Sequence, residues 1–169
     1  MKKAIVYLLL MLSVLVPAGC AANQNQTSSP SPASAPETPI AVDNTSTVSY
    51  TELVKFLSQP VDELLAKVKE TPVQTEENGM EFKQLGIKVT VYLPTKTIIR
   101  ISTQNERINF DGNKVGSPLE GFVGKFGEPV SAANNVSVFV VGDVKLSVGV
   151  DSDTKKTTIV TMEKVAMDE

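Results

Sequence analysis

The residue types that most often carry catalysis are scarce in this 169-residue chain, which contains one cysteine, Cys20, and no histidine. Without histidine, the usual general base near neutral pH and the commonest transition-metal ligand are both missing. A hydrolase would need a Ser–Lys pair or two carboxylates with separated pKa values. The carboxylates of Glu52, Asp62, Glu63 and Glu120 fall where helices are expected to begin, where the helix dipole explains them. The sequence therefore predicts no catalytic residues and a protein that is not an enzyme.

Two polar stretches contain oxygen ligands that would suit a hard cation. Asp111 and Asn113 lie in the first stretch, and Asp151 and Asp153 lie in the second. Calcium takes six to eight oxygen ligands, and neither stretch has an acidic residue at the closing position of an EF-hand loop. We therefore interpret both as turns between strands, and predict neither a metal nor another cofactor.

Cys20 stands at the junction of an apolar segment and a polar one. Lys2 and Lys3 precede an apolar run over residues 4–16, and two small residues come directly before the cysteine. A transmembrane helix needs about 20 apolar residues, so this run is too short to span a bilayer. Its layout is typical of an export signal over residues 1–19.

The sequence Ala18-Gly19-Cys20 resembles the bacterial lipobox, although Pro17 stands where that pattern usually has leucine. The resemblance implies cleavage between Gly19 and Cys20 and a diacylglyceryl group on the Cys20 sulfur. Two acyl chains anchor a protein firmly, at about 0.8 kcal/mol per buried methylene. The expected location is extracytoplasmic, anchored to a bacterial cell membrane or outer membrane. The alternative is an incidental thiol beside an ordinary signal-peptidase site.

The segment after Cys20 is rich in Ser, Pro, Ala, Asn and Thr up to residue 47. Such a composition buries too little apolar surface to fold, so residues 20–47 are expected to be a lipidated, disordered linker. Loss of Lys2 and Lys3 with the signal reduces the 16 basic groups to 14, against 19 acidic groups. The lysines are scattered, whereas nucleic-acid binding needs clustered cations, so we expect no nucleic-acid partner.

Helical and then strand-like patterns begin at Val48. Ser49 and Glu52 have the spacing of a capping box, and a second helix is expected to begin at Pro60. The pattern then changes to a period of two over residues 87–93, as in a half-buried antiparallel strand. Ile87, Val89, Val91 and Leu93 should face the core, with the residues between them facing out.

The same order of elements recurs about 58 residues later along the chain. Pro118 aligns with Pro60 and Lys145 with Lys88, while Asp111-Gly112 is typical of a hairpin turn. We predict a two-layer α+β fold built from tandem helix-then-three-strand units with antiparallel sheet. The first repeat would cover residues 48–105 and the second residues 106–169.

The second repeat also contains a helix motif, with a capping box at Ser117 and Glu120 and a helix stop at Gly127. With the lipid-bearing cysteine and the linker, it resembles the BamE/SmpA-like and beta-lactamase-inhibitor-protein-like lipoprotein domains. The match is carried by Gly116, Ser117, Phe126, Gly127 and Pro129. The resemblance implies a helix packed on an antiparallel sheet and a protein-binding role without catalytic residues.

The outward residues of the two matched strands form the candidate binding surface: Lys88, Thr90, Tyr92, Lys145 and Ser147. Exposed aromatic and long cationic side chains often anchor interfaces. We therefore expect a membrane-tethered lipoprotein that binds a protein or a cell-wall component as a structural or inhibitory module. Two alternatives stay open, an envelope hydrolase acting through carboxylates and a small-ligand sensor with an enclosed apolar pocket.

Overall fold

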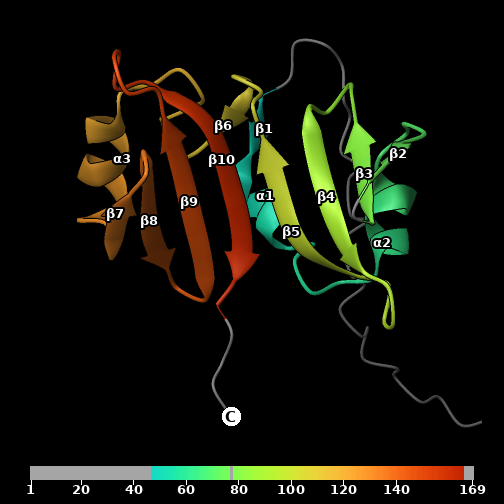
Figure 1. Ribbon diagram of the computed structural model, residues 1–169. Coiled ribbons are helices and arrows are strands. Elements are labelled where there is room, and N and C mark those ends of the chain that lie inside the picture. Colours follow the sequence, from blue (N-terminus) through green and yellow to red (C-terminus); the bar gives the residue numbers. More distant parts are fainter. Residues whose placement is uncertain (1–46, 77, 166–169) are drawn as a thin grey trace, which may run out of the picture. The chain divides into compact units, whose positions relative to one another are not determined.

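An antiparallel sheet of eight strands dominates the computed structural model, which describes residues 47–76 and 78–165 (Figure 1). The predicted signal, the cleavage site at Gly19 and Cys20, and the linker up to residue 46 lie outside the described residues. The strands, in spatial order, are β2 (Val73–Thr75), β3 (Gly79–Phe82), β4 (Ile87–Tyr92), β5 (Thr97–Thr103), β10 (Thr157–Lys164), β9 (Val144–Val150), β8 (Val136–Val141) and β7 (Ser131–Ala133).

Three short helices and a small parallel pair of strands complete the described fold. The helices are α1 (Tyr50–Val54), α2 (Val61–Lys67) and α3 (Leu119–Phe126), and β1 (Val48–Ser49) pairs in parallel with β6 (Ile108–Asn109). The chain is therefore broadly α+β with mainly antiparallel strands, as the sequence predicts. In the described part of the chain, none of the helices has the length and apolarity needed to cross a membrane.

The order of the strands places the ends of two meanders at the centre of the sheet. β2–β5 follow α2, β7–β10 follow α3, and β5 pairs with β10 from Thr103↔Val160 to Arg100↔Glu163. α2 and α3 are thus each followed by a meander of four strands, not the predicted three. The extra strands, β2 and β7, are three residues each and largely exposed, so they carry little of the apolar alternation that marks a strand.

The period-two pattern of β4 sets the two faces of the sheet. Ile87, Val89 and Val91 are buried, while Lys88 and Tyr92 are exposed. Leu93 was expected to continue the inner row, but it is 60% exposed. The strand ends at Tyr92 because the chain turns over residues 93–96, so Leu93 lies beyond the last inward position.

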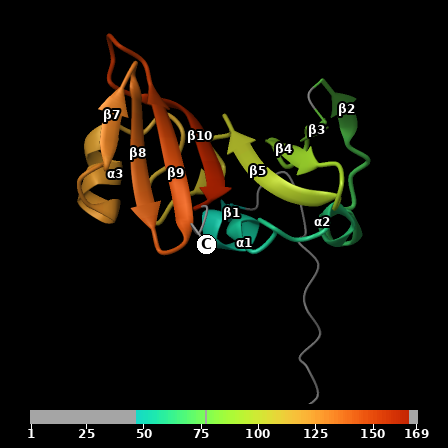
Figure 2. The ribbon, with the colours of Figure 1, turned by 60° about the horizontal axis from the view of Figure 1, so that its bottom comes forward.

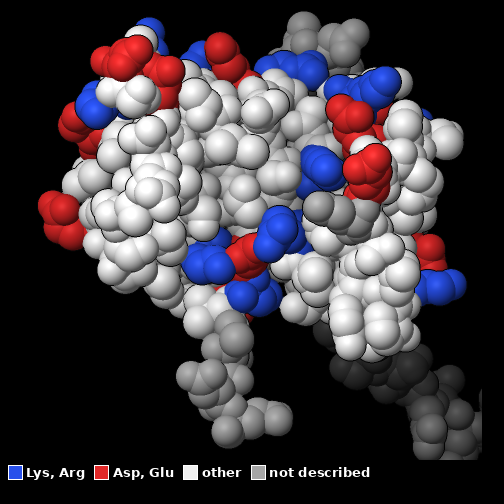
Figure 3. Space-filling model, viewed as in Figure 1, with Lys and Arg blue, Asp and Glu red and all other residues white. Residues whose placement is uncertain are grey.

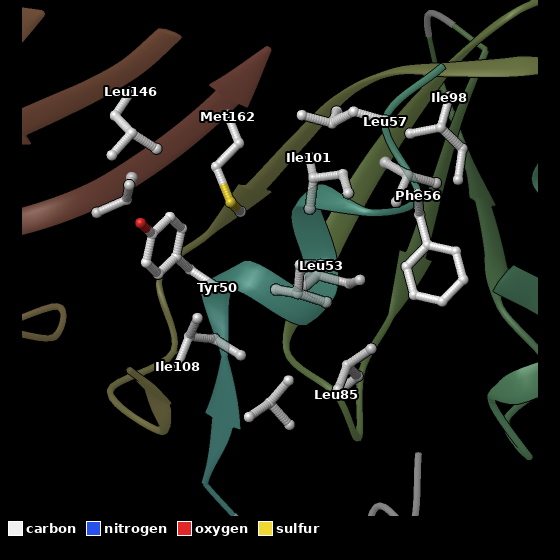
Figure 4. Close-up of a cluster of buried hydrophobic side chains, with 14 of the residues drawn as sticks. Tyr50, Leu53, Phe56, Leu57, Leu85, Ile98, Ile101, Ile108, Leu146 and Met162 are labelled. Atoms are coloured by element: carbon white, nitrogen blue, oxygen red, sulfur yellow. The ribbon is translucent and has the colours of Figure 1, made fainter. Parts of the chain in front are cut away.

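The helices pack on the inner face of the sheet, and α1 lies beneath the junction of β5 and β10 (Figures 1 and 2). Leu53 of α1 is fully buried and lies close to Ile101 of β5, while Tyr50 lies between Leu146 and Ile108 (Figure 4). Side chains from both meanders thus contribute to one continuous core. Burial of this apolar surface is the main driving force that holds the helices on the sheet.

A chain of aromatic rings extends the core under the second meander. Tyr50 stacks on Phe110 with ring centroids 5.6 Å apart, and Phe110 contacts Phe122 at 5.9 Å. Phe126 joins Phe122 to Phe139 with centroid separations of 6.2 and 6.3 Å. Such pairs each contribute about 0.5–1.5 kcal/mol beyond the area that they bury. They attach α3 to β8.

The ends of the helices agree only partly with the sequence patterns. The Ser49 hydroxyl accepts a hydrogen bond from the Thr51 backbone N–H at 3.3 Å and so caps α1. Ser117 does not cap α3: the helix begins at Leu119, and the Ser117 hydroxyl accepts instead from the Lys114 N–H at 3.1 Å. Gly127 follows the last residue of α3, as the sequence predicts, but its φ of +84° and ψ of −171° are a glycine-specific extended conformation and not the left-handed helical one of the expected helix stop.

Candidate binding face

The predicted surface residues occupy outward positions of β4 and β9, on the face of the sheet opposite the helices. Figure 3 views this face. One cross-strand row runs from Lys88 through Ser102 and Thr161 to Ser147. The next row runs from Thr90 through Arg100 and Glu163 to Lys145. The two predicted groups, on β4 and β9, are therefore separated by the two strands β5 and β10.

Glu163 lies between two cations in the middle of this face. Its carboxylate accepts a hydrogen bond from the Arg100 Nε on one side and pairs with Lys145 on the other, across the three strands β5, β10 and β9. The Glu163 side chain is 18% exposed, whereas those of Arg100 and Lys145 are 50% and 42% exposed. The carboxylate therefore fixes the two cations while leaving much of each at the surface.

The pKa of Glu163 reflects this arrangement. Partial burial acts to raise the pKa of the carboxyl group, but hydrogen bonds and charge from Lys145 and Arg100 lower it by more. The net result is a pKa below the usual range of glutamate, so Glu163 is ionised at neutral pH. Arg100, Glu163 and Lys145, which we call the central triad, thus carry a net positive charge.

An open groove of about 640 Å³ adjoins this row on the side of the first meander. Its volume is in the range of small-ligand sites. The described residues that line it come from β2, β3, β4, β5, β10 and the adjacent turns: Thr75, Glu81, Lys83, Gly86, Ile87, Lys88, Ser102, Thr103, Gln104, Asn105 and Ile159. Most of these residues have polar side chains, and Glu81, Lys83 and Lys88 bring charged groups to the groove.

Some of the polar groups in the groove are occupied in holding its shape. The Thr103 hydroxyl donates to the Gly86 carbonyl at 2.8 Å, and the Asn105 amide donates to the Leu85 carbonyl at 3.2 Å. Lys88 has a different setting, because its methylene stem lies over Gly79, where an added Cβ would be 3.0 Å from the Lys88 Cε. The absence of a side chain at Gly79 makes room for the stem, and the Lys88 side chain is exposed at the edge of the groove.

Of the five predicted surface residues, only Lys88 lines the groove. Thr90 and Lys145 belong to the row of the central triad, and Ser147 lies farther along the row of Lys88. Tyr92 is 51% exposed and lies at the hairpin end of β4, beside the exposed Leu93. The prediction that these side chains point away from the helices agrees with the burial pattern of both strands.

Sequence reasoning missed Arg100, Glu163 and Ser102. The strands that carry them, β5 and β10, lack a clean alternation. β5 pairs with β4 across a register shift between Thr90 and Val91, and β10 pairs with β9 across a shift between Thr157 and Ile159. The sequence did contain one local signal, a charged residue directly beside an apolar one: Arg100 precedes the buried Ile101, and Glu163 follows the buried Met162. Pairing of these two strands could not be read from periodicity alone.

The groove contains one carboxyl group among its described lining residues, that of Glu81. No group of three or more potential metal-binding His, Cys, Asp or Glu side chains occurs within residues 47–76 and 78–165. Asp151 accepts hydrogen bonds from the backbone of Asp153 and Thr154, which closes its turn and lowers its pKa. Asp111 pairs with Lys125 at 3.5 Å. These aspartates therefore have structural roles in their turns.

Comparison with known proteins shows a similarity of fold. No family model matches the chain, and no curated protein matches it. Among solved structures, an extracellular protein containing an SCP domain from Bacillus anthracis str. Ames superposes with a TM-score of 0.52 and 11% identity, over 66% of this chain and 45% of that one. The chain thus spans less than half the length of that protein, and the similarity concerns the fold alone.

Two further structures match less well. A cysteine-rich secretory protein from Staphylococcus aureus subsp. aureus Mu50 gives a TM-score of 0.48 and 14% identity, over 65% of this chain and 45% of that one. A DUF4309 family protein from Bacillus subtilis subsp. subtilis str. 168 gives 0.46 and 16%, over 63% and 78%.

The predicted resemblance to BamE/SmpA-like and beta-lactamase-inhibitor-protein-like domains is wrong. The fold superposes instead, with a TM-score of 0.52, on an extracellular protein containing an SCP domain. The motif between Gly116 and Pro129 misled because it encodes only the start and stop of α3, with Pro118 before the first turn and Gly127 after the last. Any short helix between two turns can carry these residues. The fold that this chain shares with a solved structure is that of part of an extracellular SCP-domain protein.

Proposed function

We propose that this protein is a membrane-tethered, extracytoplasmic binding module that presents the outer face of its sheet to a protein or cell-wall partner. The observation that carries the proposal is the outer face itself, where a groove of about 640 Å³ adjoins the central triad. Helices cover the other face of the sheet, so the outer face is the broad surface available to a partner (Figure 1). Exposed cationic side chains beside a groove that combines apolar surface with a few polar groups are typical of recognition surfaces.

The tether in this proposal is a diacylglyceryl group on Cys20, reached through the linker of residues 20–47. A flexible linker of this length has a mean reach of roughly 30 Å. The module would therefore search a shell close to the membrane while remaining attached to it. Export and lipidation follow from the lipobox-like sequence at Ala18-Gly19-Cys20, and they agree with an extracytoplasmic location.

We also infer that the two meanders arose by duplication. α2 precedes β2–β5 and α3 precedes β7–β10, and the two last strands meet at the centre of the sheet. Lys88 and Lys145, which align in the sequence, both occupy outward positions on a strand next to the central pair. A duplicated unit gives a sheet with two related outer surfaces, a simple origin for an extended binding face.

The test of this proposal is capture of a partner from the host envelope. Photo-crosslinking groups placed at Lys88 or Tyr92 in the full chain should trap a protein or a cell-wall fragment on intact cells. A matched control has the same group at Lys55, which is exposed after α1 on the helix side. Equal yields from both faces would contradict the proposal.

Variants then separate binding from folding. Tyr92→Ala and Lys88→Glu should each reduce the captured material while the melting temperature stays nearly constant, because both side chains are exposed. If instead both variants unfold, the outward role assigned to the strand is wrong.

A further inference from the structure

The charges on the outer face differ in sign from those of the whole chain. The chain has 19 acidic and 16 basic groups. On the outer positions of β3, β4, β5, β10 and β9 the charged residues are three cations, Lys88, Arg100 and Lys145, and two carboxylates, Glu81 opposite Lys88 and Glu163, so the net charge is +1. Figure 3 shows basic groups across the middle of this face, with acidic groups among them, beside them on the right and at the upper and left edges. A local positive surface on an acidic protein attracts anions.

The three cations are spaced along the face by the geometry of the sheet. Arg100 is a diagonal neighbour of Lys88, since Lys88 pairs with Ser102, and diagonal neighbours lie roughly 7–8 Å apart. Arg100 and Lys145 lie on strands separated by β10, which places them roughly 10 Å apart at the usual strand spacing. The face thus offers positive groups at intervals of roughly 7–10 Å.

Glu163 keeps two of these cations in place. By pairing with both Arg100 and Lys145 it holds each side chain over its strand, and it neutralises only one of the two charges. Side chains that are already ordered lose less entropy when a ligand binds. The third cation, Lys88, adds a contact at the edge of the groove, whose hydroxyl and amide groups can bond to uncharged parts of a ligand.

From this arrangement, and resting on the proposed function, we propose that the outer face binds an anionic cell-wall polymer. Its acidic groups contact Lys88, Arg100 and Lys145, and its neutral backbone lies along the groove. What such polymers share is a phosphate or carboxylate group that recurs along a flexible polymer backbone. One isolated anion binds such a face weakly, whereas linked anions gain from their high effective concentration.

The experiment measures binding of the full lipidated chain, in nonionic detergent, to oligomers of defined charge. The probes are a glycerol-phosphate oligomer, an oligogalacturonate, a neutral dextran oligomer of similar length and inorganic phosphate. The expected result is binding to one or both charged oligomers, little binding to dextran or phosphate, and a loss of affinity between 50 and 200 mM salt. The two charged probes distinguish a phosphate source from a carboxylate source. Equal binding to dextran would overturn the proposal.

Single variants test the three contacts. Arg100→Gln, Lys145→Gln and Lys88→Gln should each weaken binding by about fivefold, the effect of one cation near an anionic surface. Lys55→Gln removes the same charge from the helix side and should change binding by less than about twofold. Glu81→Gln tests the sign, because Glu81 lines the groove opposite Lys88 and lies outside the central triad, so its loss raises the local positive charge and should tighten binding. Weaker binding of Glu81→Gln, with its fold intact by circular dichroism, would contradict an anionic ligand.

Binding to isolated host cell walls separates this inference from the proposed function. If the chain binds walls and the three glutamine variants bind as tightly as the wild type, the anionic ligand is wrong while the binding module stands. If wall binding is lost in these variants but not in Lys55→Gln, the anionic ligand and the binding module are both supported. Failure to bind walls, together with failure to crosslink any partner, would overturn both.

Discussion

The two meanders of the sheet have the same strand order but use their faces differently. Under the first meander the helix α2 is held mainly by aliphatic residues, such as Leu64, whereas α3 under the second is held by a chain of aromatic rings through Phe122. On the outer face, the first meander carries the groove and Lys88, while β8 of the second presents the exposed Val136 and Val140. The alternation of apolar and polar residues thus gives both meanders the same strand order, whereas the side chains around each outward position give their outer surfaces different properties.

The matched lysines illustrate the same point. Lys145 pairs with Glu163 at the centre of the sheet, whereas Lys88 lies over Gly79 at the edge of the groove. Equal positions in two aligned strands therefore give one lysine a structural partner and the other an exposed place beside a cavity. The predictions below test how far this difference extends, starting with the core.

Removal of the helix anchors should give the largest effect. Phe122→Ala should lower the free energy of unfolding by about 3–5 kcal/mol and Leu64→Ala by about 2–5 kcal/mol, because both side chains are fully buried. Phe122 should cost more, since it also contacts Phe110 and Phe126. Urea denaturation measures both. A loss below about 1 kcal/mol for Phe122→Ala would show that α3 contributes little to the core.

The turns before β4 and β9 provide the next test. Gly86 and Gly142 both have positive φ, +71° and +62°, so alanine is strained at either position. A Cβ at Gly86 would also overlap the Asn105 side chain, whereas nothing lies within 4 Å of one at Gly142. Gly142→Ala should cost about 1–2 kcal/mol. Gly86→Ala should cost about 1–3 kcal/mol more because of the overlap.

Equal losses in Gly86→Ala and Gly142→Ala, measured by thermal and chemical denaturation, would mean that Asn105 moves aside freely. A larger loss in Gly86→Ala would confirm that the amide of Asn105 is held in place by its bond to the Leu85 carbonyl.

The central triad predicts a dependence of stability on pH. Because the pKa of Glu163 is lower in the folded chain than in the unfolded one, its contribution is present above the unfolded pKa of about 4.3. The contribution is lost as the pH falls through the lower folded value. Unfolding measured from pH 7 to pH 3 should show the wild type more stable than Glu163→Gln at neutral pH, with the difference becoming smaller as the pH falls.

Some loss of stability in acid should remain in Glu163→Gln, since the pKa of Asp143 and that of Asp151 are also lowered by hydrogen bonds. A difference between wild type and variant that grows in acid would contradict the assignment.

The smallest effect concerns the matched lysines. Lys145→Gln should lower the free energy of unfolding by about 0.2–1 kcal/mol, because one of the two cations that contact Glu163 is lost. Lys88→Gln should change it by no more than about 0.5 kcal/mol, as is usual for exposed positions. Thermal denaturation of both variants checks the order. The reverse order would mean that Lys88 supports the fold more than Lys145 does.

The sequence predicted the parts of the fold that depend on local pattern. The alternation in β4 and β9, the Asp111-Gly112 turn and the Gly127 helix stop are all found, because each follows from the chemistry of a few neighbouring residues. The short edge strands were missed because their exposure removes the apolar signal. The cap at Ser117 was misassigned because Ser117 and Pro118 pair with the segment before β10 in an extended conformation, so the helix begins only at Leu119.

The candidate site was harder to predict, since it depends on strands that are distant in the chain. Lys88 and Lys145 were found from their outward positions, but the central triad requires β5 to lie beside β10. That pairing joins Arg100 to Glu163 across 63 positions of sequence, and no local pattern encodes it. The groove likewise needs Ile159 of β10 next to residues of β4 and β5.

The central place of β10 has a consequence for how the chain reaches its final form. Because β10 pairs with both β5 and β9, the two meanders stay separate sheets until residues 157–164 have been made and added. Until then β5 and β9 both present free edges, and such edges favour self-association. Slow completion is expected for pairings so far apart in the chain, so this interval is when a chaperone would protect the molecule best.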